Sequence, residues 1–105
     1  MASIGVIGAG TWGTALAVLL HNNGHQTAIW SALPEEIEEM TKTRRHKNLP
    51  EITIPEEIFL TADLEEAMAC KDVLIMAVPS VFVRSTAARM KPFLKKGQLV
   101  VDVAK

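Results

Sequence analysis

The chain has 105 residues, a formal net charge of −1 at pH 7, 49 % hydrophobic residues and 22 % charged residues. This is the size and composition of one globular domain with a packed core, and the lack of excess basic charge argues against nucleic acid as a partner. The single cysteine excludes an intramolecular disulfide and no stretch approaches the roughly 18 apolar residues of a membrane span, so we expect a cytoplasmic protein without a membrane span.

The first third of the chain predicts two strands that are each followed by a helix. Residues 4–7 are apolar at consecutive positions, as in a strand that is covered on both faces. A glycine-rich turn follows, and apolar residues at 12, 15, 16, 19 and 20 predict a helix that stops near Gly24. Residues 26–30 predict the second strand, and Pro34 with two following glutamates predicts the start of the second helix.

The middle of the chain is less regular. Residues 44–55 contain two prolines and little periodicity, so we expect a loop that leads into a short third strand near residues 58–60. Asp63 has the spacing of a capping box and predicts a helix on which Leu64, Ala67 and Met68 share one face.

The last third begins with the strongest strand pattern of the chain. Residues 73–78 are almost wholly apolar, which predicts a central parallel strand. Pro79 ends this strand, and Ser80 is expected to cap a helix that runs to about Met90. Residues 98–102 predict a fifth strand. Alternation of strands and helices predicts an α/β fold of the Rossmann type, a doubly wound parallel sheet of about five strands in the order 3-2-1-4-5.

The turn after the first strand carries the motif G-x-G-x-x-G as Gly8, Gly10 and Gly13. In a strand–turn–helix unit, the first glycine permits the tight turn, the second lets backbone approach a pyrophosphate, and the third permits close packing of helix on strand. The helix N-terminus adds N–H groups and a partial positive charge. We therefore interpret this segment as a dinucleotide-binding turn.

The end of the second strand decides between NAD and NADP in this fold, because an acidic residue there accepts a hydrogen bond from the ribose 2′-hydroxyl. Here Ser31 and Ala32 follow Trp30, so this position has neither an acid for NAD nor an arginine for the 2′-phosphate of NADP. The basic run 44–47 is either a solvated loop or a segment that folds back toward such a phosphate. The preference for NAD or NADP stays open.

Ligands of open α/β sheets bind at the carboxyl ends of the strands. Pro79 leaves the fourth strand at this edge, and Phe82 in the next turn is either a cofactor contact or a core residue. Lys105 follows the fifth strand and is either a phosphate contact or a solvated lysine.

The remaining chemistry-bearing residues predict structural roles. The histidines at 21, 25 and 46 lack the spacing of a metal site, so we expect surface or helix-end positions and no metal. Trp12 and Trp30 are expected to be packing residues, and Cys70 a buried, inert thiol.

The glycine segment resembles the opening of bacterial NAD(P)-dependent glycerol-3-phosphate dehydrogenases, in the string from Gly8 to Ala17. Further matches to that family follow in order along the whole chain: Trp30, Asn48-Leu49-Pro50, Ile54-Pro55, Asp63, Ala77-Val78-Pro79-Ser80 and Val103-Ala104-Lys105. One departure concerns cofactor choice, because the family usually has an arginine at the position of Ala32.

The resemblance implies that Thr11, Trp12 and Phe82 lie against the cofactor and that Lys105 contacts both cofactor and substrate. It implies hydride transfer between glycerol 3-phosphate, a small phosphorylated substrate, and NAD or NADP, and it allows a homodimer. It also implies that residues 1–105 are a cofactor-binding domain that stops before the rest of that domain and before a helical substrate domain with the lysine general base. No catalytic residue is therefore expected in this chain.

Two alternatives remain at this point. The domain can belong to another dehydrogenase, such as a ketopantoate reductase, an opine dehydrogenase or a hydroxyacyl-CoA dehydrogenase, although Trp12, Trp30 and the terminal Val-Ala-Lys argue against these. It can also be a dinucleotide-sensing module without catalysis. The encoding reading frame would distinguish an enzyme from a sensor.

Overall fold

The computed structural model describes residues 2–103. Its main sheet consists of five parallel strands, β1 (Ser3–Ile7), β2 (Gln26–Trp30), β5 (Phe59–Thr61), β6 (Val73–Met76) and β7 (Leu99–Asp102). Their order is β5-β2-β1-β6-β7, which is 3-2-1-4-5 when these five strands are numbered alone. The predicted α/β, doubly wound topology is therefore confirmed.

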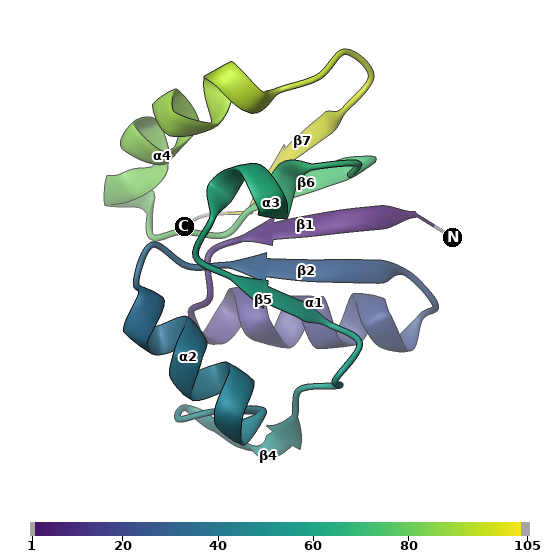
Figure 1. Cartoon of the computed structure of the whole chain (residues 1–105), viewed down its shortest axis with the longest axis vertical. Coiled ribbons are helices and arrows are strands. Elements are labelled where there is room, and N and C mark those ends of the chain that lie inside the picture. The colour runs from purple at the N-terminus through teal and green to yellow at the C-terminus, as the bar shows by residue number, and fades with distance from the viewer. Residues whose placement is uncertain (1, 104–105) are drawn as a thin grey trace.

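Helices cover both faces of this sheet (Figure 1). They are α1 (Thr11–Asn22), α2 (Pro34–Thr43), α3 (Leu64–Met68) and α4 (Val83–Met90), with short 3-10 turns η1 (Ser80–Phe82) and η2 (Lys91–Phe93) on either side of α4. Side chains of α1 and α2 join one buried cluster, and those of α3 and α4 join another. The sheet thus separates two cores.

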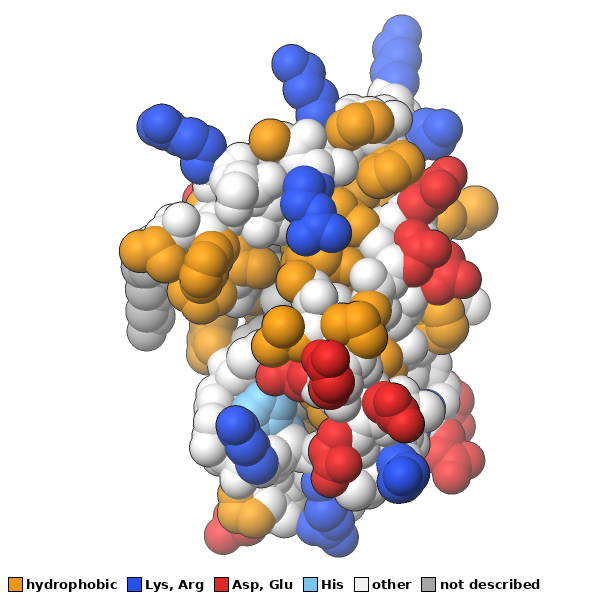
Figure 2. Space-filling model, turned by 60° about the vertical axis from the view of Figure 1, so that its left-hand side comes forward, with side chains coloured by type: hydrophobic (Ala, Val, Ile, Leu, Met, Phe, Trp, Pro, Cys, Tyr) orange, Lys and Arg blue, Asp and Glu red, His pale blue; other side chains and the backbone are white. Residues whose placement is uncertain are grey.

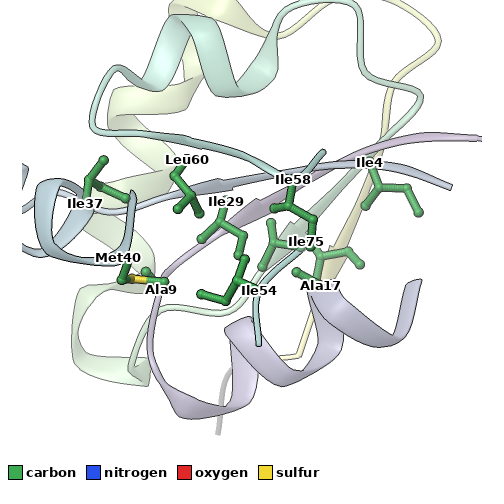
Figure 3. Close-up of a cluster of buried hydrophobic side chains, with 11 residues drawn as sticks. Ile4, Ala9, Ala17, Ile29, Ile37, Met40, Ile54, Ile58, Leu60 and Ile75 are labelled. Carbon is green, nitrogen blue, oxygen red and sulfur yellow. The ribbon is translucent and has the colours of Figure 1, made fainter. Parts of the chain in front are cut away.

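Strand side chains alternate between these two cores, as the pleat of a strand requires. In β1, Ile4 and Val6 pack toward α1 and α2, whereas Ile7 packs toward α3 and α4. Ile29 and Trp30 divide in the same way in β2. Figure 3 shows the first cluster, in which residues from the strands meet residues from α1, α2 and the segment before β5.

The segment 44–55 is not the predicted loop. It forms an antiparallel hairpin of β3 (Arg45–His46) and β4 (Leu49–Thr53). The prediction was wrong because Pro50 is tolerated in a two-stranded sheet, where a strand has a free edge and the missing N–H need not pair. The hairpin is fastened to the domain by Ile54, which is fully buried in the first core.

Two predicted helix starts have different outcomes. Asp63 caps α3, accepting hydrogen bonds from the N–H groups of Glu65 and Glu66 at 3.0 and 3.3 Å, as predicted. Ser80 does not cap α4, because η1 comes between them and Phe82 holds the capping position. The backbone takes a 3-10 turn before the α-helix starts, so the hydroxyl of Ser80 lies one turn too early.

Two expectations about burial need correction. The predicted apolar stripe of α1 is only partly buried: Leu16 and Leu20 pack against the first core, whereas Trp12 and Leu19 are exposed. The fully buried positions of α1 are Gly13, Thr14 and Ala17, and Gly13 packs so closely against Gly8 that a Cβ would not fit. Cys70 is exposed, because it lies in the turn after α3 with a φ of 57°.

Candidate functional site

The turn between β1 and α1 is built around backbone that tolerates no side chain at two positions. Gly8 has a φ of 131°, which disfavours any other residue, and a Cβ there would lie 2.8 Å from the carbonyl carbon of Ala77. A Cβ on Gly13 would lie 2.4 Å from the carbonyl oxygen of Gly8. These two glycines are therefore required by the protein's own packing of α1 against the strand ends.

Gly10 differs from both of these glycines. Its backbone is ordinary extended chain, with φ −70° and ψ −177°, and a Cβ there would meet no atom within 4 Å. Gly10 is the N-cap of α1, which has no side-chain cap and no acidic residue in its first turn. The positive end of this 12-residue helix thus has no capping side chain and no acid in its own first turn, and it lies beside a position where the absence of a side chain leaves open space.

A hollow of about 460 Å³ lies at the carboxyl ends of the strands, over this turn. Figure 2 shows the face of the molecule that these strand ends reach, with hydrophobic side chains across its middle and acidic ones along its right side and lower middle. The residues that line the hollow are Gly8, Ala9, Gly10, Trp30, Ser31, Ala32, Leu33, Glu36, Ala77, Val78, Pro79, Phe82, Ser85, Thr86 and Arg89.

Most of the predicted site residues line the hollow. Gly8, Gly10, Ser31, Ala32, Pro79 and Phe82 all line it, although they come from three separate turns. Phe82 is 55 % exposed, so it is not the core residue of the alternative interpretation. Thr11 and Trp12 start α1 beside the hollow without lining it, and Lys105 lies outside the described residues.

The two tryptophans behave differently. Trp30 is buried as predicted; its indole N–H donates to the carbonyl oxygen of Ala62 at 3.1 Å, and the guanidinium of Arg89 lies 5.2 Å from its ring centroid. Trp12 is 53 % exposed, so the packing role expected for it is wrong.

A carboxylate does lie at the end of β2, although neither Ser31 nor Ala32 is acidic. The Ser31 hydroxyl accepts a hydrogen bond from the Leu33 N–H at 3.1 Å and donates to Oε1 of Glu36 at 2.7 Å. Glu36 belongs to the first turn of α2, which folds back over the strand end. The prediction that no acid lies at the end of the second strand is therefore wrong, because it considered only the residues that directly follow the strand in the sequence.

The hairpin also reaches the glycine turn. His46 is buried, and its Nδ1 accepts from the Asn48 N–H at 3.1 Å, so Nε2 carries the proton and donates to the Ala9 carbonyl at 3.1 Å. The Asn48 side-chain amide donates to the Thr11 hydroxyl at 3.3 Å. The expected surface role of this histidine is wrong, and no sequence pattern marks a contact that spans 37 residues.

Two arginines of the basic run are engaged by backbone. The guanidinium of Arg44 donates to the carbonyls of Pro55 and Ile58 at 3.2 and 2.9 Å, and that of Arg45 donates to the Pro50 carbonyl at 2.8 Å. Lys47 is exposed and lines a smaller hollow of about 170 Å³, together with Glu36 and other residues. The run thus serves mainly to fasten the hairpin.

Other classes of site have no support in the part of the chain that the structure describes. Residues 2–103 contain no group of three or more His, Cys, Asp or Glu side chains placed to hold a metal ion. Within the same range, no helix combines the length and apolar character of a membrane-spanning segment.

The parallel sheet, the glycine turn and the hollow at the strand ends define a Rossmann-type domain of the dinucleotide-binding class. Residues 3–105 match the model of the family described as the NAD-dependent glycerol-3-phosphate dehydrogenase N-terminus. The chain belongs to this family.

Individual relatives agree with this assignment. The chain is 56 % identical over 105 residues to a glycerol-3-phosphate dehydrogenase (NAD(P)+) of Lactobacillus delbrueckii subsp. bulgaricus, and 50 % identical over 106 residues to that of Agathobacter rectalis. These matches cover 100 % of this chain but 31 % and 32 % of the relatives. The crystal structure of glycerol-3-phosphate dehydrogenase from Coxiella burnetii superposes with a TM-score of 0.93 at 28 % identity, over 99 % of this chain and 32 % of that one.

Proposed function

We propose that the hollow at the strand ends binds the dinucleotide NAD or NADP. The observation that carries the proposal is the contrast among the three glycines. Packing explains Gly8 and Gly13, whereas Gly10 borders open space at an uncapped helix N-terminus. A pyrophosphate fits that position, because its charge complements the helix dipole and its bulk needs the missing side chain.

The two ends of the hollow suit the two halves of the dinucleotide. In this fold the adenosine ribose lies near the end of the second strand, which here is the edge formed by Ser31 and Ala32. The opposite side, around Pro79 and the exposed ring of Phe82, offers apolar surface for the nicotinamide half. Thr11, Trp12 and Lys105 are proposed as further cofactor contacts, on the family resemblance.

For the whole protein we propose the glycerol-3-phosphate dehydrogenase reaction, in the cytoplasm and in a homodimer. The nicotinamide would supply or accept a hydride at carbon 2 of the substrate, which is glycerol 3-phosphate or dihydroxyacetone phosphate. The role of residues 1–105 is to bind and orient the cofactor, and Lys105 is proposed to contact the substrate phosphate ester. Since this chain covers about a third of its relatives' length, we assign the general base to the part that these relatives have in addition.

Direct titration of the chain with NADH and with NADPH tests the binding proposal. Isothermal calorimetry should show saturable binding of at least one of them, in competition with free ADP, which carries the same pyrophosphate. Failure of both dinucleotides to bind the folded chain would contradict the proposed function.

A further inference from the structure

The carboxylate of Glu36 occupies the edge of the hollow where an adenosine ribose would lie. It lines the same hollow as Gly8, Gly10 and Ala32, although it is contributed by α2. The 2.7 Å bond from the Ser31 hydroxyl holds Oε1 at the end of β2. Ser31 is itself buried and is held by the Leu33 N–H, so the carboxylate is anchored at the strand end rather than free to sample solvent.

A carboxylate at this position discriminates between two ribose chemistries. It has lone pairs for about four hydrogen bonds, of which Ser31 uses one, so it can accept from the hydroxyls of an unmodified ribose. A 2′-phosphate would instead bring a second anion beside the carboxylate, and repulsion between them is strong in a partly desolvated hollow. Ala32, the residue next to Ser31, supplies no cation to compensate.

The other charged groups near Glu36 come from α4, from α2 and from the hairpin. Arg89 also lines the hollow, but it comes from α4 on the opposite face of the sheet, with its guanidinium over the Trp30 ring. Lys47, Arg45 and Glu39 line the smaller hollow on the other side of Glu36, and Arg45 is bonded to the Pro50 carbonyl. Glu36 is thus the charged lining residue that Ser31 places at the end of β2.

We propose that Glu36, positioned by Ser31, makes this hollow select NAD over NADP. The inference rests on the proposed dinucleotide function and adds the ribose specificity that the sequence leaves open. The residue is a specificity determinant that is contributed by the helix after β2 rather than by the end of the strand itself.

The test compares the Kd values of NADH and NADPH for the parent chain and for two matched variants. Glu36→Gln removes the charge and keeps the shape, whereas Glu35→Gln removes the same charge from the neighbouring position on α2, which is exposed and does not line the hollow. We expect the parent to bind NADH about tenfold or more tightly than NADPH, and Glu36→Gln to narrow this ratio by about tenfold, mainly through tighter NADPH binding.

The outcomes separate the inference from the function on which it rests. Binding of both dinucleotides with a ratio that Glu36→Gln leaves unchanged, or a parent that prefers NADPH, would overturn the inference and leave the proposed function standing. An equal shift in Glu35→Gln would also overturn it, because only net charge would then matter. Absence of binding by the parent would overturn both proposals.

Ser31→Ala tests the positioning role of Ser31. This variant keeps the Glu36 carboxylate but removes the hydroxyl that holds it, so the ratio of the NADPH and NADH Kd values should narrow by a smaller factor than in Glu36→Gln. Circular dichroism checks that the variant is folded.

Discussion

At the scale of single residues, the glycine turn separates requirements of folding from requirements of binding. A Cβ added to Gly8 or Gly13 would lie within 3 Å of backbone atoms, so the fold itself excludes other residues at these two positions. Gly10 has no such neighbour and an unstrained backbone. A Cβ at Gly10 is therefore compatible with the folded domain, and it would point into the open space proposed for the pyrophosphate.

Gly10→Val should consequently abolish dinucleotide binding while lowering the stability of the fold by about 1 kcal/mol or less, because valine is a poorer helix N-cap than glycine. A loss of affinity of about 100-fold or more is expected for NADH and NADPH alike, since the branched side chain would exclude the pyrophosphate from the helix N-terminus. Calorimetric titration beside urea unfolding measures both quantities.

Two control variants accompany Gly10→Val. Ala88→Val adds a branched side chain on an exposed helical position outside the hollow and should keep the parental affinity. Gly13→Ala should instead destabilise the fold, by about 2–4 kcal/mol, because its Cβ would collide with the Gly8 carbonyl. Parental affinity in Gly10→Val would refute the pyrophosphate assignment.

At the scale of elements, the hairpin β3–β4 supports the binding turn from outside the main sheet. Its buried His46 donates to the carbonyl of Ala9, which lies between the first two glycines of the G-x-G-x-x-G segment, and Asn48 contacts Thr11 at the start of α1. Ile54, immediately after β4, anchors the same hairpin in the core. The turn is therefore held by two polar contacts and one apolar anchor from a segment that follows α2.

His46→Ala should destabilise the domain by about 2–3 kcal/mol, because it leaves the Asn48 N–H without its partner, removes one of the two donors to the buried Ala9 carbonyl and creates a cavity. NADH affinity should fall several-fold, since the turn loses its support. Urea unfolding and calorimetry check the two effects.

His21→Ala is the matched histidine control. His21 lies 3.7 Å from an exposed glutamate, and an ion pair of this kind contributes little, so the change in stability should stay within about 0.5 kcal/mol. Equal effects of the two substitutions would show that the His46 contacts do not support the turn.

At the scale of the whole molecule, the hollow proposed for the cofactor has few groups that could transfer a proton. Among the lining residues within 2–103, Glu36 and Arg89 are the charged ones; Glu36 is bonded to Ser31, and the guanidinium of Arg89 lies over the Trp30 ring. Hydride transfer to a ketone also requires an oriented substrate and a proton donor. We therefore propose that the hollow binds the cofactor and that groups outside it orient the substrate and transfer the proton.

The 105-residue chain should therefore bind NADH without reducing dihydroxyacetone phosphate at a measurable rate. The lack of general acid–base help alone costs about 10²- to 10⁴-fold, and the lack of substrate positioning multiplies that loss. NADH absorbance in the presence of dihydroxyacetone phosphate, followed on a preparation whose cofactor binding has been titrated, measures this. Sustained turnover would show that the acid or base lies within this chain.

The sequence by itself determined the fold class, the strand order and the place of the glycine turn. Apolar runs such as residues 73–78 report burial on both faces of a sheet, and glycines at fixed spacing report a turn geometry, so both are local signals. The predicted bounds of the second strand, residues 26–30, agree with those of β2. The family resemblance rested on equally local strings of residues.

Only the tertiary structure decided which side chains meet at that turn. The contact of His46 with Ala9 depends on a hairpin whose short strands carry no periodicity, and the placement of Glu36 depends on the angle at which α2 leaves β2. The exposure of Trp12 depends on how α1 packs against the strand ends, where Gly13 closely approaches Gly8. These are properties of packing between elements, and a pattern read along one element does not contain them.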